Sequence, residues 1–148
     1  MKTINIIKIE YVIFAGSSTS FNGNAVPPAT TNLTTQERAY NTAIINASAE
    51  ALKQNPSYLI MLHGHANATD NTTEEEAILN EISLARAESA KEHLLALYSS
   101  INNGIALEDA RFSVSGYGSN RNIVMGVNSP YASLNRRVEV ILFEIASK

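Results

Sequence analysis

The sequence predicts a single domain built as an α/β (α+β) sandwich, with helices packed on one face of a mixed β-sheet. Strand-like and helix-like segments alternate along the chain. In the former, apolar residues recur every second position, and in the latter they recur every third or fourth position. Their predicted order is β-α-β-α-β-β, which favours helices layered against a sheet. The 148 residues suffice for one domain with its own core, and they contain no internal repeat.

The N-terminal segment is predicted to be a half-buried strand followed by a long loop. Residues 4–14 alternate between two sides, only one of which is apolar. The apolar side carries Ile7, Ile9, Tyr11 and Ile13, and the other side carries Lys8 and Glu10. Residues 15–33 are rich in Gly, Ser, Asn, Thr and Pro. A loop of this length in a compact domain is either functional or mobile.

Two helices are predicted from capping signals and apolar spacing. Thr34-Thr35-Gln36-Glu37 has the pattern of a capping box, and it opens a helix that ends near Gln54. A second capping signal in residues 72–76 opens a longer helix that reaches about Ser99. The predicted buried stripes are Ala43, Ala47, Ala51 and Leu52 on the first helix, and Leu79, Ser83, Ala87, Ala90, Leu94 and Leu97 on the second.

Three more strands complete the predicted sheet. Residues 58–63 form a short apolar run, which is typical of a central strand, and residues 111–117 alternate. Residues 137–145 are apolar on both faces, so this last strand is expected inside the sheet or under helices. Residues 118–134 are expected to be irregular.

Composition excludes several classes of function. The net charge is only -3, with acids and bases interspersed, which argues against nucleic acid or an anionic membrane surface as the main partner. No apolar stretch is long enough to span a membrane. The absence of Cys excludes disulfides and thiolate metal sites. His63 and His65 would share a strand face, but no third metal ligand is evident, so no metal site is predicted.

Neither enzymatic activity nor a cofactor is expected. No nucleophile motif frames Ser17 or Ser18, and no phosphate-binding glycine loop is present. A signal peptide is not expected either, because Lys8 and Glu10 interrupt the N-terminal apolar run. If the native protein is exported, its export signal is absent from this chain. We therefore expect residues 1–148 to be a mature form or a domain excised from a larger exported protein.

Arg86 is the first candidate for ligand binding. On a helix its neighbours three and four residues away would be Ile82, Ser83, Ser89 and Ala90, none of which is acidic. The guanidinium therefore needs an acceptor from elsewhere. That acceptor is either an acid such as Glu139, in a tertiary ion pair, or a ligand carboxylate, which the planar guanidinium fork suits. The residues alone leave both alternatives open.

The loop after the predicted central strand is the second candidate. It begins at Gly64 and offers His65, Asn67, Thr69 and Asp70. Such a loop can direct main-chain groups and short polar side chains at a small ligand. The same residue types also form ordinary turns, so the loop alone does not decide between these functions.

Five segments in order resemble the C-terminal OmpA-like domain family, which includes the peptidoglycan-associated lipoproteins and the flagellar stator protein MotB. Their order and rough spacing agree with the family from about residue 11 to about residue 145. The sequence Gly-His-Ala-Asn at residues 64–67 is similar to that of some spirochaete members of the family. The five segments are Asn55-Pro56, Gly64-His65, Leu84-Ala85-Arg86-Ala87, Gly116-Tyr117-Gly118 and Asn135-Arg136-Arg137-Val138-Glu139.

The resemblance implies a periplasmic domain, associated with the outer membrane or cell wall, that binds peptidoglycan noncovalently. In the family, a loop Asp takes the ammonium of the stem-peptide diamino acid and a helix Arg takes its carboxylate. These positions fall on Asn67 and Arg86. The predicted ligand-binding residues are Gly64, His65, Ala66, Asn67, Asp70, Arg86, Asn135 and Arg137. The implied partner is the stem peptide, with other envelope proteins as further partners.

The neutral Asn67 is the main departure from the family pattern, and Leu79 and Ala132 are others. A hydrogen bond to a charged group contributes about 1.5–3 kcal/mol and a neutral one about 0.5–1.5 kcal/mol, so we expect weakened rather than abolished binding. Asp70 or Glu74 would restore a carboxylate from the longer loop. The alternative is a degenerate OmpA-like domain that no longer binds peptidoglycan and serves as a structural or protein-interaction module.

Overall fold

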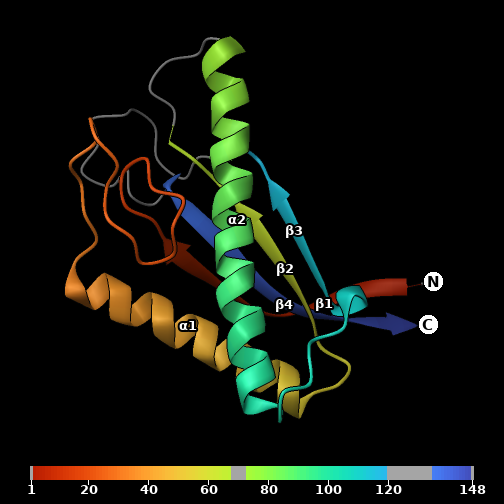
Figure 1. Ribbon diagram of the computed structural model, residues 1–148. Coiled ribbons are helices and arrows are strands. Elements are labelled where there is room, and N and C mark those ends of the chain that lie inside the picture. The colour runs from red at the N-terminus through yellow and green to blue at the C-terminus, as the bar shows by residue number, and fades with distance from the viewer. Residues whose placement is uncertain (1, 68–72, 120–134, 148) are drawn as a thin grey trace.

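The computed structural model describes residues 2–67, 73–119 and 135–147, which form a mixed sheet covered by two helices on one face (Figure 1). This arrangement confirms the predicted fold class and the order β-α-β-α-β-β. Ala132 and Asp70 lie outside the described residues. The elements are β1 (Lys2–Ile13), α1 (Thr35–Gln54), β2 (Leu59–Gly64), α2 (Thr73–Ile101), the 3-10 turn η1 (Asp109–Arg111), β3 (Phe112–Gly116) and β4 (Arg137–Ser147).

The described strands lie in the order β1-β4-β2-β3. β4 is antiparallel to both β1 and β2, and β2 is parallel to β3. β4 is therefore an interior strand, which is what its two apolar faces predict. The core between the sheet and the helices includes Ile60, Leu62, Val138, Val140 and Leu142.

α2 carries the buried stripe that its spacing predicts. Ser83 and Ala87 lie against Gly64 of β2, and Ala87, Ala90 and Leu94 belong to the main core. Leu97 is only half-buried. The buried members of the stripe are Leu79, Ser83, Ala87, Ala90 and Leu94.

α1 begins as predicted but buries a different stripe. The Thr34 hydroxyl accepts a hydrogen bond from the Glu37 N–H at 3.0 Å, and Glu37 Oε1 accepts one from the Thr34 N–H at 2.8 Å. The predicted alanine stripe is wrong, because Ala43 and Ala47 are exposed. The apolar residues that α1 buries are Ile44, Ile45, Ala49 and Leu52. Isoleucine side chains remove more apolar surface from water than alanine, so they determine which side faces the sheet.

β1 also differs from its prediction, because its isoleucines do not face the core. Ile9 remains 50% exposed, whereas Val12 and Phe14 are fully buried. The register between β1 and β4 shifts between Ile6 and Lys8, so one extra residue interrupts the simple alternation. β1 lies at the edge of the sheet, and only its last residues reach the main core.

The long loop between β1 and α1 is folded back on itself. The Gly16 N–H donates to the Thr31 carbonyl at 2.9 Å, and the Gly16 carbonyl accepts from the Val26 N–H at 3.0 Å. The Phe21 N–H donates to the Ser89 hydroxyl of α2 at 2.9 Å. The loop is thus attached to α2 and forms a wall beside the end of β1 (Figure 1).

Candidate functional site

The chain that leaves β2 is held between two other strands. The His65 N–H donates to the Arg137 carbonyl at 2.8 Å, and the Ala66 N–H donates to the Gly118 carbonyl at 2.8 Å. On the same side as Gly118, the Gly64 carbonyl accepts from the Tyr117 N–H at 3.0 Å. These bonds continue the sheet beyond β2 and fix the path of the main chain as far as the following residue, Asn67.

Two glycines bring α2 close to this end of the sheet. Gly64 and Gly116 lie opposite each other in the ladder between β2 and β3. A Cβ on Gly64 would collide with the main-chain carbonyl of Ser83, and one on Gly116 would lie 2.6 Å from the Leu84 nitrogen. Only glycine permits this approach. One turn later the same helix presents Arg86 to the strand ends.

Arg86 is buried without an acidic partner among the described residues. Its side chain is 1% exposed. Nε donates to the Ser18 carbonyl at 2.8 Å, and Nη1 donates to the His65 carbonyl at 3.0 Å. Burial, together with the nearby charge of Arg136, lowers the pKa of Arg86 to about 9. A buried cation that has only neutral acceptors is suited to an incoming anion.

A cavity of about 630 Å³ opens beside Arg86. This volume is typical of small-molecule sites. Arg136 also lines it, donates through Nε to the Phe14 carbonyl at 3.2 Å, and has its pKa lowered mainly by burial. The described lining contains two cations and no acid: Gly16, Ser17, Pro28, Ala29, Thr30, Thr31, Ala66, Asn67, Ile78, Leu79, Ile82, Arg86 and Arg136.

Asn67 lies at this cavity and is held by Asn135. Asn135 Nδ2 donates to Asn67 Oδ1 at 2.8 Å, and Asn135 itself is fully buried. Asn135 does not line the cavity within the described part of the chain, so it reaches the site through Asn67. The two amides form a neutral pair at the position where the resemblance leads one to expect an acid.

His65, Glu139 and Arg137 form a separate cluster. His65 Nε2 lies 2.8 Å from Glu139 Oε1, and Arg137 Nη2 lies 3.5 Å from Glu139 Oε2. The hydrogen bond from His65 is the main cause of a lowered Glu139 pKa, and the charge of Arg137 adds to it. Glu139 is thus engaged by other residues, and the ion pair with Arg86, one of the two alternatives that the sequence left open, does not form. No three His, Cys, Asp or Glu residues in the described ranges could hold a metal ion.

The structure brings together most of the predicted site residues in two roles. Ala66, Asn67 and Arg86 line the cavity. Gly64, His65 and Asn135 do not line the cavity but hold the residues that do. Gly64 lets α2 approach the sheet, the His65 carbonyl accepts from Arg86, and Asn135 donates to Asn67. Arg137 is directed elsewhere, with its guanidinium 5.5 Å from the ring centroid of Tyr11. Asp70 lies outside the described residues, and the side chain of Glu74 is likewise not described.

Arg136 is the charged lining residue that the predicted set lacks. Strand alternation provides a signal for it, because neighbouring residues of a strand point to opposite faces. Val138 is fully buried in the core beneath the helices. Arg136 has the same parity as Val138, whereas Arg137 has the parity of Glu139. A ligand site under α2 therefore favours Arg136 over Arg137.

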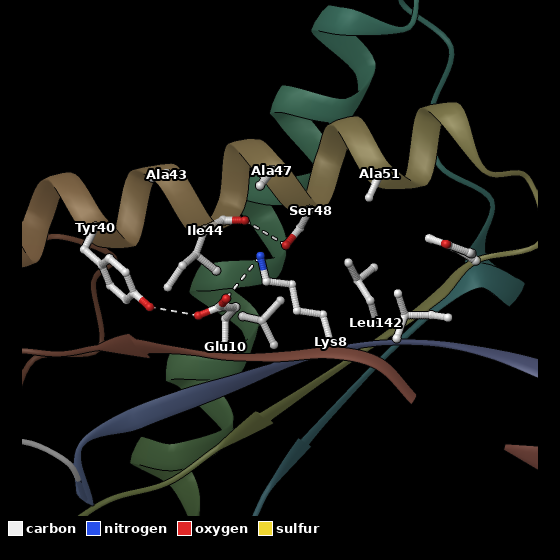
Figure 2. Close-up of a pocket in the computed structure, with 12 residues that line it drawn as sticks. Lys8, Glu10, Tyr40, Ala43, Ile44, Ala47, Ser48, Ala51 and Leu142 are labelled. Atoms are coloured by element: carbon white, nitrogen blue, oxygen red, sulfur yellow. Dashed lines mark hydrogen bonds and ion pairs between the residues drawn. The ribbon is translucent and has the colours of Figure 1, made fainter. Parts of the chain in front are cut away.

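A second concavity lies between α1 and β1, as Figure 2 shows. It measures about 400 Å³, and the exposed Ala43 and Ala47 form part of its wall. Its charged groups already satisfy one another. Glu10 accepts from the Tyr40 hydroxyl at 2.8 Å and lies 3.2 Å from Lys8 Nζ. This groove therefore has no unpaired charge to offer a ligand, unlike the cavity at Arg86.

Several solved domains have a similar fold. The peptidoglycan-associated lipoprotein from Burkholderia pseudomallei matches with a TM-score of 0.64 and 18% identity, covering 89% of this chain and 88% of that one. The OmpA-like domain of FopA1 from Francisella tularensis matches with a TM-score of 0.62 and 17% identity, covering 94% and 75%. The periplasmic domain of Helicobacter pylori MotB matches with a TM-score of 0.56 and 18% identity, covering 90% and 80%.

These matches confirm that the chain has the fold of OmpA-like domains. No protein-family model and no curated protein sequence matches the chain. At these low identities, the likeness concerns the path of the backbone. The function must be argued from the cavity itself.

Proposed function

We propose that this chain is a noncovalent binding module that holds a carboxylate of the peptidoglycan stem peptide and so anchors an envelope protein to the cell wall. The ligand site is the cavity beside Arg86. The module has no catalytic role and needs no cofactor. Its ligand is retained by hydrogen bonds and charge, because the described lining offers donors and no paired nucleophile and base.

The observation that carries this proposal is the state of Arg86. Its guanidinium is almost fully buried, makes two bonds to main-chain carbonyls and has no described acid beside it. A second guanidinium, on Arg136, lines the same cavity. The charge of Glu37 acts on Arg136, whereas Arg86 has no described acid. Keeping a buried cation without its own counter-charge costs stability unless an anion joins it. A ligand carboxylate supplies that anion and can accept two parallel bonds.

The proposed setting is the periplasm, where the module would meet peptidoglycan, in association with the cell wall or outer membrane. The fold is shared with a peptidoglycan-associated lipoprotein and with a periplasmic domain, which supports this location. Neither of the helices that the structure describes has the length and apolarity needed to cross a bilayer. The pairing of β1 with β4 along one sheet supports a single domain. We propose that this domain belongs to an exported protein.

Co-sedimentation with purified sacculi tests the proposal. The wild-type protein should sediment with sacculi, and Arg86→Gln should bind at least about tenfold more weakly, because it removes a charged hydrogen-bond donor. Arg86→Lys keeps the charge but loses the planar fork, so we expect intermediate binding. Circular dichroism of each variant verifies that it is folded.

Lys91→Gln is the matched control, because it removes one positive charge from the same helix outside the cavity. It should bind sacculi like the wild type. If wild type and Arg86→Gln sediment equally, or if neither sediments, Arg86 does not hold peptidoglycan. The neutral pair of Asn67 and Asn135 would then favour the second candidate function, a structural or protein-interaction domain with the same fold.

A further inference from the structure

The contact between Asn67 and Asn135 determines which chemical group Asn67 can offer. Asn67 Oδ1 accepts a hydrogen bond from Asn135 Nδ2 at 2.8 Å. The oxygen of Asn67 is thus engaged by a fully buried neighbour. The Nδ2 group of Asn67 has no described partner, and its N–H groups can only donate. Asn67 lines the cavity, so it adds a donor to the site.

The charged residues that line the cavity, among those described, are both cationic, and Glu37 acts on Arg136 from outside the lining. Arg86 and Arg136 present guanidinium groups, which donate and do not accept. Ser17, Thr30 and Thr31 add hydroxyls that can do either. A free ammonium on the ligand would bring a third positive charge beside two others and would find few acceptors. An amide carbonyl in the same place would accept from the Asn67 amide and carry no charge.

We propose that this cavity selects a carboxylate whose neighbouring amine is acylated, in preference to the free zwitterion. The proposal rests on the function proposed above and specifies its ligand. Two parts of peptidoglycan share this chemistry. One is a diamino acid whose side-chain amine is already in a cross-link, and the other is the C-terminal residue of a stem peptide. Asn67 is the specificity-determining residue, and Asn135 positions it.

Isothermal titration with matched peptides tests the selectivity. The first pair is a diaminopimelate-containing stem tripeptide, with every carboxylate amidated except the one beside the side-chain amine, and the same peptide acetylated on that amine. The wild type should bind the acetylated form about tenfold more tightly, which corresponds to about 1.4 kcal/mol. N-acetyl-D-alanyl-D-alanine is the third ligand. Binding it as tightly as the acetylated tripeptide indicates the C-terminal source, and weaker binding indicates the cross-linked diamino acid.

Asn67→Asp should reverse the preference. One carboxylate oxygen would still accept from Asn135, and the other would face the cavity as an acceptor for ammonium. The free-amine tripeptide should then bind about tenfold more tightly than it binds the wild type, and the acetylated form, which loses the amide donor of Asn67, should bind more weakly than it binds the wild type. Asn46→Asp adds the same charge to an exposed position on α1 and should leave the selectivity unchanged.

The two proposals fail in different ways. If the wild type prefers the free-amine tripeptide, the selectivity proposal is wrong, and loss of that preference in Asp70→Asn would identify the acid responsible. The anchoring function stands in that case if sacculus binding still depends on Arg86. If neither tripeptide form nor sacculi bind, the anchoring function is wrong, and the selectivity proposal falls with it.

Discussion

Arg86 Nη1 donates to the main-chain carbonyl of His65 at 3.0 Å. The guanidinium is therefore attached to the path of the backbone after β2, and it has no bond to a side chain in the described part of that loop. The same loop residue donates its N–H to the Arg137 carbonyl at 2.8 Å. The position of Arg86 thus depends on how β2, β4 and α2 meet, which makes the site sensitive to changes in backbone packing.

Gly64→Ala should damage both the fold and the site. Its new methyl group would collide with the Ser83 carbonyl and push α2 away from the sheet. Overpacking of this kind costs about 1–3 kcal/mol, and we expect the upper end because the obstacle is main chain. Urea unfolding measures the loss. Gly104→Ala, at φ 81° with nothing nearby, is the control and should cost about 1 kcal/mol. Equal losses in the two variants would contradict the packing argument.

Arg136→Gln should reduce the salt dependence of ligand binding. Arg136 is half-buried and open to screening, whereas Arg86 is almost completely buried. Raising ionic strength from about 0.1 M to about 1 M shortens the Debye length from about 10 Å to about 3 Å. Wild-type affinity for the acetylated tripeptide should fall several-fold over this range, and the affinity of Arg136→Gln, weaker at low salt, should fall less. Lys91→Gln should keep the wild-type slope. If affinity falls equally with ionic strength in all three proteins, Arg136 does not interact electrostatically with the ligand.

Glu139→Gln should change how stability depends on pH. The hydrogen bond from His65 holds the pKa of Glu139 below its ordinary value of 4.5. A carboxyl with a lowered pKa in the folded state adds stability that is present above the unfolded pKa and lost as pH falls through the folded pKa. The wild type should therefore lose its advantage over Glu139→Gln as pH falls below 4.5. Urea unfolding of both proteins at a series of pH values measures this difference, and an advantage that grows on acidification would contradict the assignment.

Thr34→Ala should destabilise the protein by about 1 kcal/mol, the usual effect of losing an N-cap side chain. Thr34 and Glu37 satisfy each other's main-chain and side-chain groups at the start of α1. Thr35→Ala removes a similar hydroxyl at the next position, where no described side-chain cap bond exists, and should be nearly neutral. Thermal unfolding compares the two variants. If Thr35→Ala is as costly as Thr34→Ala, the loss does not come from the cap.

The sequence allowed accurate prediction wherever one local rule acted alone. The capping pattern at Thr34 placed the start of α1, and the spacing from Leu79 to Leu94 identified the buried face of α2. The two apolar faces of residues 137–145 indicated an interior strand, and β4 is one. Arg86 was identified as a residue that needs a distant acceptor because its helical neighbours are not acidic.

Prediction failed where side chains compete or where register changes. On α1, spacing fits both the alanines and the isoleucines, and the larger apolar area of Ile44 and Ile45 decides which side is buried. In β1, the shift after Ile6 breaks the alternation, so neighbouring residues do not keep the expected sides. The motif at residues 135–139 contains two adjacent arginines and does not show which one lines the cavity. Alternation along the strand does, because Arg136 is two residues from Val138 and so lies on the face that the helices cover.

The pairing of Lys2 with Ser147 has a mechanical consequence. It lies at the opposite end of β1 from Phe14, whose N–H donates to the Arg136 carbonyl beside the cavity. A pull between the start of β1 and a ligand held in the cavity would run along the strand for roughly 40 Å. The hydrogen bonds between β1 and β4 lie across that direction and would share the load together. The sheet is therefore oriented to resist tension in shear, and it would not open one bond at a time.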